Sequence, residues 1–243
     1  MRWTLFYKLG SPKWFYDISG KWVPFLSVIT AAVLLPALIW GLAFAPEDYL
    51  QGNSYRIIFI HVPSAFLAQA VYMMMAVAAV IHLVWKMKMA DIALTVLVPI
   101  GASFTMLALV SGAIWGKPTW GTWWQWDARL TSMLILFFLY IGLFALRNAL
   151  QNHHAERACA VLTLVGVVNI PIIKFSVQWW NTLHQGTTLT LTEKPSMAID
   201  MLIPLLLSIA GFYLFLFLVT IQRLRVEILV RERKTVWVSR LIS

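Results

Sequence analysis

Six long runs of apolar residues dominate the chain, and short polar stretches separate them. The runs cover residues 22–45, 62–85, 92–115, 130–146, 158–173 and 201–222. A helix needs about 20 residues to cross the hydrocarbon core of a bilayer, and it satisfies its own backbone hydrogen bonds there. The fourth and fifth runs are short, so their helices should extend past the apolar core, the fifth towards Trp180. The pattern predicts an all-α integral membrane protein with six transmembrane helices.

The connections between the runs are too short to fold by themselves. The longest lies at about residues 174–200, and domains below about 40 residues usually need disulfides or metal ions. We therefore expect residues 1–243 to form a single six-helix membrane domain. The first run is longer than the roughly 7–15 apolar residues of a signal peptide, so it is predicted to be an uncleaved span.

Composition supports this class and excludes several activities. Hydrophobic residues make up 60% of the 243 residues and charged residues only 12%, against about 25% in soluble domains. The single cysteine, Cys159, excludes an internal disulfide and a cysteine-rich metal site. The sequence contains no C-x-x-C-H motif for covalent c-type haem and no complete phosphate-binding loop. We predict that the chain is not an enzyme and that a partner subunit performs any ATP hydrolysis.

The distribution of Lys and Arg predicts the topology. The N-terminal tail, the second and fourth connections and the C-terminal tail carry 14 of the 19 basic residues, and the other connections carry five. Because basic residues favour the cytoplasmic side, both termini are predicted to be cytoplasmic and the first, third and fifth connections to face outward. The net charge of +9 follows from this bias and requires no nucleic-acid partner.

Tryptophan is concentrated at the end of the third run and in the connection that follows it. Five of the 13 tryptophans lie within residues 115–127, at Trp115, Trp120, Trp123, Trp124 and Trp126. Single tryptophans commonly anchor a protein at the membrane interface, but this density exceeds what anchoring needs. A short interfacial helix after Pro118 would place Trp120, Trp123, Trp124 and Asp127 on one face. Indole rings stack on planar π-systems, so the segment predicts a shelf for a large planar ligand such as a tetrapyrrole.

Two of the five histidines lie on the outward side and flank this segment. They are His61 and His184, whereas His82, His153 and His154 are predicted to be structural or interfacial. Each outward histidine, taken alone, could as readily be an interface residue with satisfied hydrogen bonds as a metal ligand. Together, two neutral imidazoles above and below a porphyrin give a six-coordinate haem.

Haem propionates also require cations, and two arginines lie close in sequence to these residues. Arg56 precedes His61 by five residues, and Arg129 follows Asp127 by two. Arginine suits bidentate binding of carboxylates. Arg129 could equally pair with Asp127 or mark the membrane boundary, and the sequence leaves these alternatives open.

A tryptophan-rich signature called WWD marks the bacterial haem-handling proteins of cytochrome c maturation. This chain resembles it in the pattern Trp115-Gly116-x-Pro118-x-Trp120-Gly121-x-x-Trp124-x-Trp126-Asp127, within residues 115–129. The chain length, the six spans and the flanking His61 and His184 are similar to one family in this group, the haem exporter C proteins of the Ccm (system I) pathway. Larger WWD relatives have more spans and a sizeable soluble domain.

The resemblance implies a function in the bacterial inner membrane. It implies that haem b binds transiently and without covalent attachment at the periplasmic face, with His61 and His184 as axial ligands and the tryptophans against the porphyrin. Arg56 and Arg129 match important arginines of the family by position. The implied partners are a membrane-anchored periplasmic haem chaperone that receives the haem, an ABC-type ATPase, a second permease-like membrane subunit, a small single-helix subunit and membrane lipid.

Two alternatives are compatible with the sequence. One is a b-type cytochrome or quinone-binding redox subunit, although such proteins usually place their haem histidines within the spans. The other is a ligand-free scaffold subunit of a transporter, in which the tryptophans only anchor the protein in the membrane.

Overall fold

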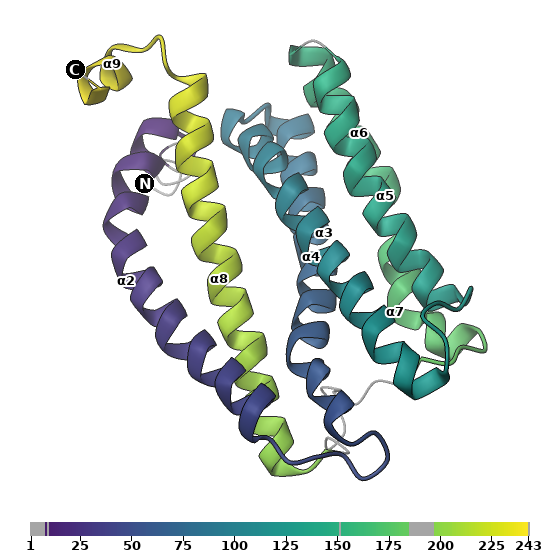
Figure 1. Cartoon of the computed structure of the whole chain (residues 1–243). Coiled ribbons are helices and arrows are strands. Elements are labelled where there is room, and N and C mark those ends of the chain that lie inside the picture. The colour runs from purple at the N-terminus through teal and green to yellow at the C-terminus, as the bar shows by residue number, and fades with distance from the viewer. Residues whose placement is uncertain (1–7, 9, 151, 185–196, 243) are drawn as a thin grey trace.

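The computed structural model describes residues 8, 10–150, 152–184 and 197–242, and within them the chain is helical and contains no β-strand (Figure 1). The α-helices are α2 (Pro12–Ile39), α3 (Ile58–Trp85), α4 (Lys88–Trp120), α5 (Ala128–Ala149), α6 (Asn152–Gly166), α7 (Asn169–Trp179), α8 (Ile199–Arg231) and α9 (Val236–Ile242). A π-helical turn, η1 (Trp40–Phe44), continues α2, and a 3₁₀ turn, η2 (Asn53–Ile57), leads into α3.

Six helical stretches of the described chain are long and apolar enough to cross a membrane. They span Pro12–Phe44, Asn53–Trp85, Lys88–Trp120, Ala128–Ala149, His154–Trp179 and Ile199–Arg231. The six predicted helices are therefore present with the length and composition of spans, and the fifth reaches Trp179 as expected. The first helix begins before the apolar run because Ser11 caps it, accepting the Trp14 N–H at 3.5 Å, and Pro12 is suited to a first helical turn. The direction of crossing stays a prediction from charge.

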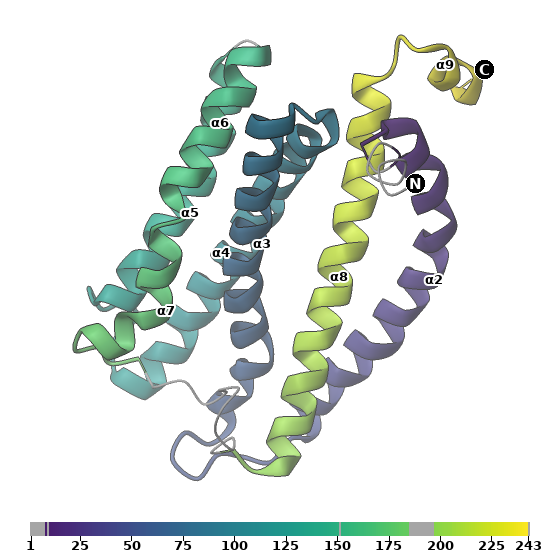
Figure 2. The same ribbon diagram turned by 180° about the vertical axis from the view of Figure 1, so that it is seen from behind.

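The helices form two groups around α3 and α4 (Figures 1 and 2). On one side α2 packs along α8, and on the other α5 lies beside α6 and α7. Tyr140 of α5 crosses the centre, where its hydroxyl donates to the Ala68 carbonyl at 2.8 Å. Gly101 of α4 makes room for this ring, because a Cβ at that position would lie 2.1 Å from Tyr140.

An ion-pair cluster around the buried Asp91 joins α4, α5 and α8 close to the end of α8. Asp91, only 1% exposed, accepts two hydrogen bonds from Arg147 at 2.7 and 2.6 Å and one from Arg231 at 2.6 Å. Arg231 also donates to the Thr95 hydroxyl at 2.8 Å. Because each charge has hydrogen-bonded partners, the cluster can exist in an apolar environment.

The fifth span consists of two helices. The helix breaks at residues 167–168 between α6 and α7, and the Asn169 side chain donates to the Ser132 carbonyl of α5 at 2.9 Å. Helix α7 ends at Trp179, and Trp180 has extended backbone angles. The segment that carries His184 therefore leaves the helix before it reaches the histidine.

The predicted interfacial helix after Pro118 is wrong. Helix α4 continues through Pro118 to Trp120 and ends at Gly121, whose φ of 79° is the left-handed conformation that glycine adopts readily. Residues 121–127 are not helical, and Asp127 starts α5 by accepting the Leu130 N–H at 2.8 Å. Pro118 lies in the last turn of α4, where its missing N–H removes only one hydrogen bond from a helix already formed.

Candidate functional site

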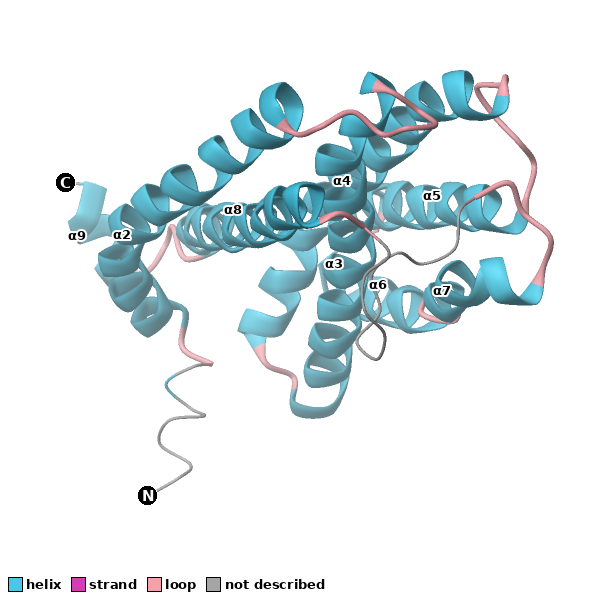
Figure 3. Cartoon of the chain, turned by 90° about the horizontal axis from the view of Figure 1, so that it is seen from below, coloured by secondary structure: helices cyan, strands magenta, loops and turns pink. Residues whose placement is uncertain are grey.

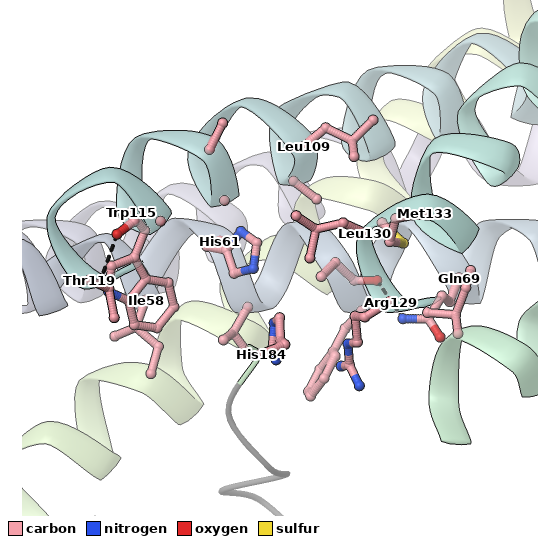
Figure 4. Close-up of a pocket in the computed structure, with 18 of the residues that line it drawn as sticks. Ile58, His61, Gln69, Leu109, Trp115, Thr119, Arg129, Leu130, Met133 and His184 are labelled. Atoms are coloured by element: carbon pink, nitrogen blue, oxygen red, sulfur yellow. Dashed lines mark hydrogen bonds between the residues drawn. The ribbon is translucent and has the colours of Figure 1, made fainter. Parts of the chain in front are cut away.

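A cavity of about 380 Å³ lies among α3, α4, α5, α7, α8 and the segment after α7 (Figure 4). Figure 3 shows the arrangement of these helices from below. Small-molecule sites typically have volumes of about 300–1,000 Å³ and mostly apolar walls. Its walls include Ile58, Val62, Leu109, Leu130 and Met133. Six of the ten predicted site residues also line it: His61, His184, Trp115, Trp120, Trp124 and Arg129.

His61 is held in one orientation by α4. Its Nδ1 lies 3.1 Å from the Ser111 hydroxyl, which itself donates to the Leu107 carbonyl at 2.6 Å. Because the Ser111 hydroxyl proton is already donated to Leu107, the Ser111 oxygen acts as the acceptor of the Nδ1–H of His61. The lone pair of Nε2 is then available to bind a metal ion. Metal-bound histidines usually donate their second ring N–H in this way. Gly112 gives the ring its space, since a Cβ there would lie 2.9 Å from His61 Cε1.

His184 faces His61 across part of the cavity (Figure 4). Their ring centres are 6.5 Å apart, and the ring planes are inclined by 35°. Two imidazoles bound on opposite sides of one metal ion, through bonds of about 2.0–2.1 Å, have ring centres about 6.3 Å apart. The spacing therefore suits one metal ion between the two rings.

Two tryptophans of the WWD segment contact these histidines. The Trp115 ring meets His61 edge to face at 5.6 Å, and its indole N–H donates to the Gln51 side chain at 2.7 Å. Trp120 lies 6.2 Å from His184, inclined by 57°. These indoles fix both imidazoles and give the cavity an aromatic wall.

Two donors on the cavity wall have unused hydrogen-bonding capacity. Trp124 Nε1 and Arg129 Nη1 are both buried, and neither has a hydrogen-bond partner in the described part of the chain. An unsatisfied buried donor costs about 1–3 kcal/mol, so such groups usually serve a ligand or a water molecule. Both groups are donors of the kind that bind a carboxylate.

Four predicted site residues lie outside the cavity lining. Trp123 and Trp126 are 57% and 74% exposed, although Trp126 meets Trp124 edge to face at 5.4 Å. Arg56 donates to the Ala45 carbonyl at 3.1 and 2.6 Å, so it fastens the end of η1. Asp127 caps α5, and the ion pairs of the described residues include none between it and Arg129.

Two of the remaining histidines, His82 and His154, are not among the residues that line the cavity. His82 is buried near the end of α3, His154 is exposed, and the side chain of His153 is outside the described residues. Sequence reasoning missed Ser111, Gly112 and Gln51. Ser111 precedes Trp115 by four residues, so both lie on the same face of one helix. This spacing from a predicted site residue was the signal that could have identified Ser111.

Comparisons with known proteins identify close relatives along the whole chain. The family described as Heme exporter protein C matches residues 5–239. The Heme exporter protein C of Haemophilus influenzae is 50% identical over 240 residues, which are 98% of each chain. The Escherichia coli K12 protein of that name is 51% identical over 243 residues, covering 99% of this chain and 97% of the relative. The Bradyrhizobium diazoefficiens protein is 46% identical over 225 residues, covering 92% and 85%.

Proposed function

The chain belongs to the Heme exporter protein C family, and on this premise we propose that it binds haem between His61 and His184 and delivers it for c-type cytochrome maturation. The observation that carries the proposal is the 6.5 Å separation of the two imidazole centres. The Nδ1–H hydrogen bond of His61 supports it, because it leaves Nε2 free for iron. The haem is a b-type haem, bound transiently and without covalent attachment.

In this proposal the chain's own residues divide the work of binding. His61 and His184 bind the iron, and Trp115 and Trp120 hold these imidazoles in place. Trp124 and Arg129 offer their unpaired N–H groups to the propionates. Trp123 and Trp126, which are exposed, border the route by which a partner reaches the ligand.

The site faces the periplasm of the bacterial inner membrane, and a membrane-anchored haem chaperone receives the haem there. The basic residues that mark the opposite side as cytoplasmic support this orientation. The chain acts in an ABC-type complex with an ATPase subunit, a second permease-like subunit and a small single-helix subunit. The first span, which contains α2, has surface available for lipid or other subunits. Only 17% of the residues in its most apolar 18-residue stretch are buried within the chain.

An absorbance titration of the purified protein in detergent with haem tests the proposal. We expect saturation at one haem per chain, a low-spin six-coordinate spectrum, and loss of that haem when the purified chaperone is added. Rapid reduction of the bound haem by quinol, without transfer to the chaperone, would instead favour the redox-subunit alternative. Failure to bind haem would favour the scaffold alternative.

Replacing Ser111 with alanine is expected to weaken haem binding about ten-fold, because outer partners of metal-bound histidines typically contribute 10- to 100-fold. The Ser111→Thr variant, which keeps the hydroxyl, should recover most of the affinity. Ser103→Ala is the matched control on α4, since that exposed hydroxyl donates only to the Pro99 carbonyl at 2.9 Å. Equal affinities of the Ser111→Ala and Ser103→Ala variants would contradict the assigned role.

The propionate contacts are tested with the Trp124→Phe and Arg129→Gln variants and two ligands. Hydrogen bonds to charged groups contribute about 1.5–3 kcal/mol, so each variant should bind haem about 10- to 100-fold more weakly. Haem dimethyl ester lacks the carboxylate charges, and its affinity should change little between wild type and variants. If each variant weakens both ligands equally, these residues act through shape or folding instead.

A further inference from the structure

The carboxylate of Asp127 joins two segments that are distant in sequence. Its Oδ1 accepts the Leu130 N–H at 2.8 Å and so caps α5. Its Oδ2 accepts a hydrogen bond from the hydroxyl of Thr182, which follows α7. Asp127 is 9% exposed, so water competes little for these bonds.

The chain of hydrogen bonds continues to His184. The oxygen of the Thr182 hydroxyl accepts the backbone N–H of His184 at 3.0 Å. Thr182 thus donates to the carboxylate and accepts from the histidine backbone, which are complementary uses of one hydroxyl. These bonds connect the WWD segment to the second predicted iron ligand.

The two predicted iron ligands depend on different supports. His61 lies within α3, so the backbone hydrogen bonds of a helix fix its position. The described residues that lead to His184, 180–184, are not helical, because α7 ends at Trp179. A ligand on such a segment needs an anchor to stay within about 0.5 Å of a productive geometry.

We propose that Asp127 and Thr182 are positioning residues that hold His184 at its iron-ligating position through this hydrogen-bond relay. The inference rests on the proposed haem-binding function and deepens it. It assigns the acidic residue of the WWD segment to the geometry of the second ligand, while Trp120 contacts the ring of the same histidine.

Two substitutions break the relay with little other change. Thr182→Val keeps the shape of the side chain but removes the hydroxyl. Asp127→Asn keeps an oxygen that caps α5, since asparagine is as good a helix cap as aspartate. It replaces Oδ2 with an amide group that can only donate to the Thr182 oxygen, so the Thr182 hydroxyl hydrogen loses its charged acceptor.

Haem titrations of these variants, followed by absorbance, test the proposal. Each should bind haem about ten-fold more weakly and give a partly five-coordinate, high-spin spectrum. The double variant should be no worse than either single one, because both remove the same relay. Thr182→Ser, which retains the hydroxyl, should restore the six-coordinate spectrum. Thr163→Val is the control, because the Thr163 hydroxyl donates only to the Cys159 carbonyl of its own helix, at 2.8 Å.

The His184→Ala variant separates failure of this proposal from failure of the proposed function. If His184→Ala loses the six-coordinate spectrum while Thr182→Val keeps it, the relay proposal is overturned and the ligand assignment stands. If His184→Ala keeps the wild-type spectrum, the ligand assignment itself is overturned. A defect in Asp127→Asn alone, without one in Thr182→Val, would also overturn the relay and assign Asp127 to another role.

Discussion

Replacing His61 or His184 with alanine is expected to weaken haem binding by more than about 100-fold, since even outer partners of metal-bound histidines contribute about 10- to 100-fold. Each substitution removes one of the two facing imidazoles, whose ring centres lie 6.5 Å apart. The remaining imidazole would leave a five-coordinate, high-spin haem. The measurement is an absorbance titration in detergent together with the haem content of the protein as purified.

The two histidines are expected to differ in their response to added imidazole. Free imidazole can replace the His184 side chain, because that ligand lies on a segment outside the helices. In His61→Ala it must fit the narrow space against α4, where Ser111 and Gly112 lie next to the His61 ring. We expect imidazole to restore the six-coordinate spectrum more completely in His184→Ala. The exposed His154 provides the control, and His154→Ala should bind haem normally.

Replacing Asp91 with alanine is expected to lower the free energy of unfolding by about 1.5–3 kcal/mol, because Arg147 and Arg231 lose the buried carboxylate to which both donate, although Arg231 keeps its ion pair with Glu227. Arg147 and Arg231 both donate to this carboxylate, so three helices lose a common contact. Thermal unfolding in detergent measures the effect. The folded fraction of Asp91→Ala should still bind haem with wild-type affinity, because Asp91 is not among the residues that line the cavity.

Lys88 provides the matched control for this prediction. It pairs with Glu232 nearby, but its side chain is 52% exposed. Exposed ion pairs contribute about 0–1 kcal/mol, so Lys88→Ala should change stability little. If Asp91→Ala were as stable as Lys88→Ala, the buried cluster would not be the contact that stabilises this end of the bundle.

The spans were predictable because membrane crossing imposes a local rule. Each predicted run lies almost wholly within one of the helical stretches, since an apolar segment in a bilayer must satisfy its own hydrogen bonds wherever its neighbours lie. Helix ends were less predictable. They depend on single residues, as Gly121 shows by ending α4 three residues beyond Pro118.

The chemistry of the site was only partly accessible from the sequence. The pattern of tryptophans and outward histidines indicated a tetrapyrrole, and it resembled the family that the comparisons confirm. The roles of individual residues were harder to assign. Arg56 and Arg129 both lie close in sequence to predicted site residues, but their surroundings in the structure differ. Arg56 is satisfied by the backbone carbonyl of Ala45, whereas Arg129 keeps a buried, unpaired N–H on the cavity wall.

The sequence alone therefore determined the membrane class, the six spans, the family and the residue types of the site, because these follow from composition, run length and a specific motif. Only the tertiary structure decided which side chains meet. It brought His61 and His184 to facing positions and placed Ser111 against His61 and Thr182 between Asp127 and His184. Such contacts arise where helices pack and loops end, and no local pattern in the chain encodes the distance between two distant segments.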